Sequence, residues 1–189
     1  MRIGVDIDEV LAELNKKLIT YMNTQHNYSC SYDDLKEYSL NKCFNVSEKE
    51  FDHVYFSFFE SPDVESIEPV DNSVNIIKDI AKEHEIIIIT ARQSFHEKQT
   101  TEWLEKYYPG IFKEIYFTNQ DEEGSKGDIA LKHNIDLHID DAIHNCNTVT
   151  EKGIPCLLFN RPWNQETLNP NITRVNSWEE IAHTLQKYK

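Results

Sequence analysis

Short apolar runs alternate with amphipathic stretches along most of the chain. The runs have the length and the β-branched content of buried strands, and the stretches between them carry apolar residues at helical spacing. The strands predicted in this way are 3–7, 86–89, 115–117, 137–139 and 154–159. Strands that alternate with helices form parallel sheets through right-handed crossovers. The pattern therefore predicts an α/β fold, a three-layer, doubly wound parallel sheet.

One long segment, residues 27–69, interrupts this alternation. It follows a helix predicted from Val10 to about Gln25, and it is aromatic and acidic without the period of a strand. Four of its rings fall on one helical face: Phe51, Tyr55, Phe58 and Phe59. We therefore expect a small, mainly helical cap inserted after the first strand and helix. The expected boundaries are residues 15–69 for the cap and residues 1–14 and 70–189 for the α/β core.

The composition excludes several classes of protein. The 189 residues carry a formal net charge of −14, which disfavours binding along a nucleic-acid backbone. No apolar run approaches the roughly 20 residues of a membrane span, and acidic residues from Asp6 onward interrupt any signal peptide. The four cysteines are scattered without a C-x-x-C pair, so we expect reduced thiols in a cytoplasmic protein.

Acidic residues follow two of the predicted strands. Asp6 and Asp8 lie at the end of the first strand, and Asp140 and Asp141 come after the fourth. Open α/β sheets bind ligands at the carboxyl edge of their strands, where buried carboxylates are costly without a positive partner. Such oxygen ligands suit Mg²⁺, so we expect a magnesium site at this edge. Asp140-Asp141 alone would instead be typical of a helix N-terminus.

A hydroxyl and an ammonium complete a set of groups suited to phosphoryl transfer. Thr90 follows the second strand and Lys126 enters a predicted helix, with Lys132 as the alternative lysine. A carboxylate at Asp6 can attack phosphorus, and a carboxyl at Asp8 can protonate the leaving oxygen and later accept a proton from water. The hydroxyl and the ammonium can stabilise the phosphoryl oxygens.

These residues resemble, in order, the four motifs of the haloacid-dehalogenase-like (HAD) phosphohydrolases. The motifs are Asp6-Ile7-Asp8-Glu9-Val10, Ile89-Thr90, Lys126, and Ile139-Asp140-Asp141 through Asn145. Within that superfamily the chain resembles the bacterial relatives of the 5'-deoxyribonucleotidases. The closer likeness rests on Val10-Leu11-Ala12, Phe58-Phe59-Glu60-Ser61, Ile67-Glu68-Pro69-Val70, and Phe159-Asn160-Arg161-Pro162-Trp163-Asn164.

The resemblance implies a role for each acidic residue. Asp6 would be the nucleophile and a Mg²⁺ ligand. Asp8 would be the acid–base group and would contact the metal through its backbone carbonyl. Asp141 would bind the metal directly, with Asp140 and Asn145 in support.

The resemblance also implies that Thr90, Ala91 and Lys126 bind the phosphoryl group. Two positions depart from the family pattern. Glu9 stands where many members have glycine, and Arg92 stands where vertebrate nucleotidases have a smaller residue. Arg92 is therefore a candidate for an added phosphate contact or an altered choice of substrate.

These roles predict a Mg²⁺-dependent phosphatase that forms an aspartyl-phosphate, with a nucleoside 5'-monophosphate as the expected substrate. The resemblance also implies that Phe59 is the cap ring that faces that substrate, because its doublet with Phe58 matches the family cap; apolar rings suit the stacking of a nucleobase. Most of the other cap aromatics are expected to form the core of the insertion. The segment Arg161-Pro162-Trp163 is expected to be a loop that closes the edge of the sheet, and a ligand role for it stays open.

Three alternative functions stay open on the sequence alone. The chain could be a phosphatase for sugar phosphates or other small metabolites, a phosphoaccepting receiver-like signalling domain, or a silent binding domain. The long insertion directly after the first helix disfavours a receiver, and the retention of both Asp6 and Asp8 disfavours a silent domain. The sequence predicts neither the oligomeric state nor a preference among bases and sugars.

Overall fold

The computed structural model describes residues 1–118 and 124–188, and its sheet has six parallel strands. They are β1 (Arg2–Val5), β2 (Glu85–Thr90), β3 (Ile115–Phe117), β4 (Leu137–Asp140), β5 (Cys156–Phe159) and β6 (Ile172–Val175). The strand order is β3-β2-β1-β4-β5-β6. The direction of winding reverses between β1 and β4, so the carboxyl ends of these two strands border the crevice where doubly wound sheets bind ligands. The predicted fold class is confirmed.

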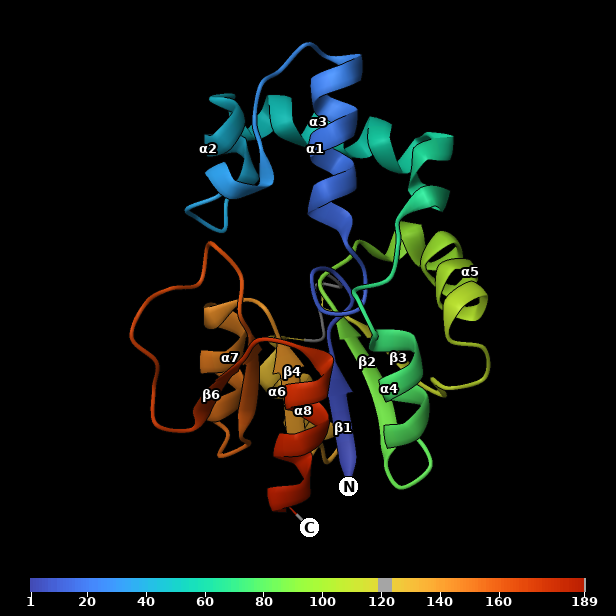
Figure 1. Ribbon diagram of the computed structural model, residues 1–189, viewed down its shortest axis with the longest axis vertical. Helices are drawn as coiled ribbons and strands as arrows, with labels where there is room; N and C mark the ends of the chain where they lie inside the picture. The colour runs from blue at the N-terminus through green and yellow to red at the C-terminus, as the bar shows by residue number, and fades with distance from the viewer. Residues whose placement is uncertain (119–123, 189) are drawn as a thin grey trace.

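Helices cover both faces of the sheet (Figure 1). They are α4 (Ser73–Ile80), α5 (Glu97–Tyr107), α6 (Lys126–Lys132), α7 (Ile143–Thr150) and α8 (Trp178–Leu185). Ile86 and Ile88 of β2 belong to the hydrophobic cluster that includes residues of α4 and α8. Ile87 and Ile89 belong to the cluster that includes residues of α6 and α7. The run of four isoleucines is therefore buried on both faces, as central parallel strands are.

A helical cap follows the first strand and lies beyond the carboxyl ends of β1 and β2 (Figure 1). It comprises α1 (Leu14–Gln25), the 3-10 turn η1 (Tyr32–Asp34), α2 (Leu40–Phe44), α3 (Glu48–Glu60) and the 3-10 turn η2 (Pro62–Ser66). Helix α3 begins after Ser47, whose hydroxyl accepts the N–H of Glu50. Phe58 of α3 is fully buried and packs edge-on against Tyr21 of α1, with ring centroids 5.3 Å apart.

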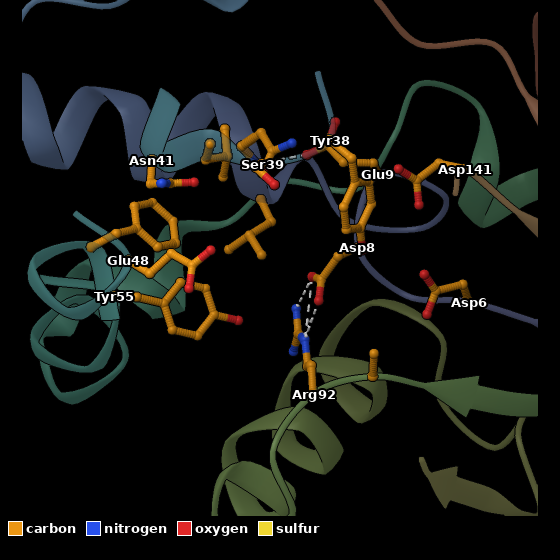
Figure 2. A pocket seen from close by; sticks show the side chains of 15 residues that line it. Asp6, Asp8, Glu9, Tyr38, Ser39, Asn41, Glu48, Tyr55, Arg92 and Asp141 are labelled. Atoms are coloured by element: carbon orange, nitrogen blue, oxygen red, sulfur yellow. Dashed lines mark hydrogen bonds and ion pairs between the residues drawn. The ribbon is translucent and has the colours of Figure 1, made fainter. Parts of the chain in front are cut away.

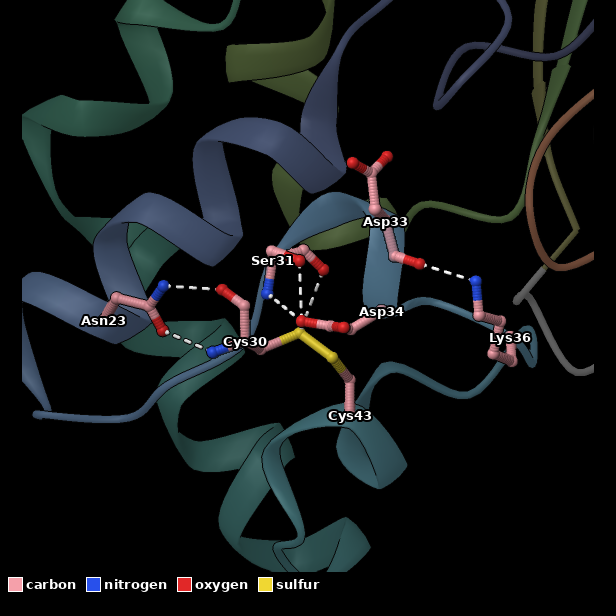
Figure 3. Close-up of a disulfide and its surroundings, with 7 residues drawn as sticks. All are labelled: Asn23, Cys30, Ser31, Asp33, Asp34, Lys36 and Cys43. Carbon is pink, nitrogen blue, oxygen red and sulfur yellow. Dashed lines mark hydrogen bonds between the residues drawn. A yellow bond between two sulfur atoms is a disulfide. The ribbon is translucent and has the colours of Figure 1, made fainter.

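The expectation of reduced thiols is wrong for two of the four cysteines. Cys30 and Cys43 form a disulfide inside the cap, with Cα atoms 5.9 Å apart (Figure 3). The bond joins the segment before η1 to α2, two segments whose proximity depends on the fold of the cap and not on cysteine spacing. Cys146 and Cys156 are free and buried in the core.

Local boundaries differ from the sequence expectation in several places. The first strand ends at Val5 and not at Ile7. The first helix begins at Leu14 and not at Val10, because residues after Asp8 form a tight turn in which the N–H groups of Val10 and Leu11 donate to the Ile7 carbonyl. The last predicted strand begins at Cys156. Strand β6 was not predicted, since only its two ends are buried. No helix among the described residues is long and apolar enough to cross a membrane.

Candidate active site

Three buried carboxylates meet at the carboxyl ends of the neighbouring strands β1 and β4. The pairing of these strands continues to Asp6, whose N–H donates to the Ile139 carbonyl at 3.0 Å. Asp6 therefore lies beside Asp140 and Asp141, and each of the three offers an oxygen within 4.8 Å of the others. The structure thus brings together the acids of the first and last motifs.

Lys126 extends from the first turn of α6 into this cluster. Its Nζ lies 2.8 Å from Asp6 Oδ1 and 2.7 Å from Asp140 Oδ2, and the side chain is buried. Close packing of α6 on α7 sets this reach, because a Cβ at Gly127 would lie 2.0 Å from the Thr148 carbonyl oxygen. Lys132, the alternative lysine, lies at the exposed end of the same helix. The geometry favours Lys126.

The pKa values around this lysine show how the charge is shared. Burial disfavours the ammonium, but Asp140 and Asp6 outweigh it and raise the pKa of Lys126. Burial would also raise the pKa of Asp140, yet Lys126 and His138 hold it below its usual range. Burial raises the pKa of Asp6 to about 7 in spite of Lys126. Burial and the neighbouring Asp140 and Asp6 raise the pKa of Asp141 well above its usual range.

The cluster therefore holds more negative charge than Lys126 balances. Among the described residues, no cationic side chain forms an ion pair with Asp141. Buried carboxylates without a counter-charge are costly, and a set of carboxylate oxygens is what a hard divalent cation binds. On this ground the residues present fit Mg²⁺.

Asp140 is held by several donors besides the lysine. Its Oδ1 accepts the N–H of Ala142 at 2.9 Å and the amide of Asn145 at 3.2 Å, and its Oδ2 lies 3.1 Å from His138 Nε2. The supporting role predicted for Asp140 stays a prediction. The sequence did not indicate this contact of His138 with Asp140, because the position of a residue within a strand does not show which neighbouring side chain it will contact.

Asp8 is paired with Arg92, the residue that departs from the vertebrate pattern. The Nε of Arg92 lies 3.0 Å from Asp8 Oδ2 and its Nη2 lies 2.6 Å from Oδ1, a two-point contact (Figure 2). The side chain of Arg92 is buried, and the backbone N–H of Arg92 donates to the Thr90 hydroxyl at 3.2 Å. Arg92 also faces the ring of Phe59, 5.7 Å from the centroid.

Glu9, the second departure, sustains a left-handed backbone conformation with φ of +61°. Its carboxylate accepts the N–H of Asn15 at 2.6 Å and the hydroxyl of Tyr32 at 2.9 Å. Its backbone carbonyl accepts Arg161 Nε at 2.8 Å. Such a conformation is strained for a residue with a side chain, and these contacts from three segments hold it. The turn that carries Asp8 is thereby fixed without glycine.

A cavity of about 320 Å³ extends from the acids to the cap (Figure 2). Asp6, Asp8 and Asp141 lie at its core end, with Ala91 and Arg92 beside them. Its cap end is lined by Tyr38, Ser39, Leu40, Asn41, Glu48, Phe51 and Tyr55. The expected amphipathic face of α3 therefore supplies two of these rings, whereas the polar residues near the start of α2 had no recognisable sequence signal.

Phe59 does not line this cavity. It is buried, stacks on His96 with centroids 4.4 Å apart, and borders a neighbouring cavity of about 590 Å³ on the other side of Arg92. Tyr55 and Phe51, about one and two turns earlier on α3, reach the cavity that contains the acids. The role predicted for Phe59 toward a ligand stays a prediction.

The doubly wound sheet, the helical cap and the acidic cluster at the strand ends define a haloacid-dehalogenase-like hydrolase. Two solved structures of this class are similar to the chain over nearly its whole length. A haloacid dehalogenase-like family protein, SP0104 from Streptococcus pneumoniae, has a TM-score of 0.74 at 15% identity, covering 100% of this chain and 98% of that one. The HAD-hydrolase YfnB from Bacillus subtilis, described as bound to magnesium, has a TM-score of 0.66 at 14% identity, covering 97% of each chain.

Within this class the chain belongs to the family described as 5' nucleotidase, deoxy (Pyrimidine), cytosolic type C, which matches residues 1–188. It is therefore a nucleotidase-family hydrolase that acts on phosphomonoesters. The Bacillus subtilis protein YqfW is 29% identical over 192 residues, covering 100% of this chain and 95% of that protein. A 5'(3')-deoxyribonucleotidase of Bacillus subtilis is 28% identical over 186 residues, covering 97% of each. The predicted superfamily and family are confirmed.

Proposed function

We propose that this protein is a Mg²⁺-dependent 5'-nucleotidase that hydrolyses nucleoside or deoxynucleoside 5'-monophosphates through an aspartyl-phosphate. The observation that carries the proposal is the single cavity that joins Asp6 and Asp8 to the ring-lined cap. A phosphate placed at the acids leaves the rest of the substrate facing Phe51 and Tyr55. Family membership and the name of the deoxyribonucleotidase relative support the same substrate class.

The residues of the site divide the reaction between them. An Asp6 oxygen attacks phosphorus and forms a P–O bond, while the bond from phosphorus to the nucleoside 5'-oxygen breaks and that oxygen takes a proton from Asp8. Water then attacks the phosphoryl group on Asp6 and gives its proton to Asp8, which releases phosphate and regenerates both carboxyl groups. Asp8 must leave its two-point contact with Arg92 to exchange these protons, so the guanidinium becomes available to the bound phosphate.

Three groups would hold the magnesium ion: the carboxylates of Asp6 and Asp141 and the backbone carbonyl of Asp8. When bound, Mg²⁺ supplies positive charge that offsets the repulsion between an anionic nucleophile and an anionic phosphate. Lys126 and Thr90 would stabilise the phosphoryl oxygens beside it. We also propose a cytoplasmic location, in line with the cytosolic type named in the family description.

A substrate panel tests the proposal. Purified protein with Mg²⁺ is given ribonucleoside and deoxyribonucleoside 5'-monophosphates together with sugar phosphates, and released phosphate is measured. We expect nucleotides to be the preferred substrates and Asp6→Asn to abolish turnover with the fold retained. Faster release from sugar phosphates would replace the substrate assignment, and unchanged turnover in Asp6→Asn would remove the assigned nucleophile.

A further inference from the structure

The segment after β5, Arg161 to Asn164, holds the last acidic motif in place. The indole N–H of Trp163 donates to Asp141 Oδ2 at 2.9 Å. The side-chain amide of Asn164 donates to the backbone carbonyl of Asp141 at 2.7 Å and to that of Phe159 at 2.8 Å. Trp163, Asn164 and Asp141 are all buried. The carboxylate and the main chain of Asp141 are thus both fixed from this one segment.

The same segment reaches the turn that carries Asp8. Arg161 donates two hydrogen bonds to the Glu9 carbonyl, from Nε at 2.8 Å and from Nη2. Glu9 is the residue with φ of +61°, directly after Asp8. Arg161 and Trp163 therefore contact both sides of the acidic crevice, one at β1 and the other at β4.

The chemistry of the donor matters at Asp141. An indole N–H orients a carboxylate but brings no positive charge, unlike the ammonium that Lys126 presents to Asp6 and Asp140. In the described part of the chain, Trp163 is the side-chain donor that hydrogen-bonds the Asp141 carboxylate. Asp141 Oδ2 is thus occupied by a neutral donor, and Oδ1 is left to a cation. Groups that hydrogen-bond metal ligands in this way orient them and tune affinity.

We propose that Trp163 is a positioning residue that orients Asp141 for a divalent cation, with Asn164 fixing the main chain of the same residue. This inference rests on the proposed magnesium-dependent function. It gives the Arg161–Asn164 segment a part in building the site, which the sequence alone did not predict.

Trp163→Phe tests the inference, because phenylalanine keeps an aromatic ring and removes the N–H. Trp103→Phe is the matched control: Trp103 is 6% exposed against 5% for Trp163, and its indole donates to the Ile67 carbonyl at the same 2.9 Å. The readout is Mg²⁺ and Mn²⁺ affinity, measured by calorimetry on the metal-free proteins. We expect affinity about 10- to 100-fold weaker in Trp163→Phe and unchanged in Trp103→Phe.

Two further measurements separate positioning from general damage. At high Mg²⁺ the turnover of Trp163→Phe should recover toward that of the unmodified protein, whereas a damaged fold would not recover. Mg²⁺ should also change the tryptophan fluorescence of the unmodified protein and of Trp103→Phe, and this change should be largely lost in Trp163→Phe. If Trp163→Phe does not fold, Asn164→Ala replaces it and should also weaken metal binding.

The outcomes are distinct. Equal metal affinity in Trp163→Phe and the unmodified protein would overturn the positioning role while leaving the proposed function intact. Equal weakening in both tryptophan variants would also overturn it, because the effect would then be general. An unmodified protein that binds neither Mg²⁺ nor Mn²⁺ would overturn the metal requirement itself.

Discussion

Replacing Asp6, the proposed nucleophile, should stabilise the metal-free protein at neutral pH. Burial, the largest cause, raises the pKa of Asp6 from its ordinary 3.8 to about 7. The folded state therefore holds this proton more tightly than the unfolded state. The resulting stability is complete below about pH 4 and is lost as the pH rises through about 7. A shift of about three pH units, at about 1.36 kcal/mol each, corresponds to at most about 4 kcal/mol.

Asp6→Asn removes this titration and keeps a neutral side chain of nearly the same shape. Below about pH 4 the two proteins should have similar free energies of unfolding, because Asp6 is then protonated in both the folded and the unfolded state. At about pH 5 the unfolded carboxyl is already ionised, and the unmodified protein should be less stable than Asp6→Asn by about 1–2 kcal/mol. Toward about pH 8 the unmodified protein should fall below Asp6→Asn by up to about 4 kcal/mol. The proposed catalytic carboxylate is thus predicted to lower the stability of the protein, a cost that the site retains for its chemistry.

Urea unfolding of both proteins in a chelator, at several pH values, measures this difference. Burial lowers the pKa values of His96, His138 and His144, which makes stability rise with pH in both proteins. The comparison with Asp6→Asn cancels that opposing trend. Adding Mg²⁺ should stabilise the unmodified protein more at about pH 8 than at about pH 5, because metal ligands must be deprotonated. A difference between the two proteins that stays constant with pH would refute the reasoning.

Two other predictions concern Arg92 and the disulfide. Arg92→Gln should lower kcat for a nucleoside monophosphate by about 100-fold or more, through loss of a well-placed Asp8 and of a positive group for the phosphate. The loss should be smaller with p-nitrophenyl phosphate, because nitrophenolate leaves without a proton and only the contributions of Arg92 to phosphate binding and to the second step are removed; equal losses would show that Arg92 acts on the phosphoryl group alone. Cys30→Ser should lower stability by about 2–4 kcal/mol and raise KM, since Tyr38 and Asn41 lie between the bonded cysteines; a reducing agent should affect the unmodified protein in the same way and leave the variant unchanged.

The sequence predicted the parts of the site that are set by strand ends. Asp6 and Asp141 could be placed at one edge because the carboxyl ends of parallel strands meet there, whatever the details of the loops. Lys126 could be placed near them once its helix was recognised. These positions follow from the periodicity of the core, which any sequence of this fold must display.

The remaining contacts depend on how loops pack, and loops carry no period. Nothing in the residues around Trp163 indicates that its indole reaches Asp141, 22 positions earlier in the chain. The pairing of Cys30 with Cys43 depends in the same way on the tertiary structure of the cap. Tyr38 and Asn41 line the cavity from a short irregular segment and from the start of α2. The hydrophobic pattern of such short segments does not predict which way a side chain points.

The distribution of charge links the resting site to its substrate. Asp6, Asp8, Asp140 and Asp141 face two cationic side chains, Lys126 and Arg92, so the formal balance at the crevice is negative by about the charge of one divalent cation. A phosphate dianion that enters a site filled by such a cation then needs a further positive group. Arg92 is the group that can supply it, because its contact with Asp8 must open before Asp8 can exchange a proton. Phosphate binding and the release of Asp8 from Arg92 would therefore occur together. A residue smaller than arginine at position 92 would not couple the two.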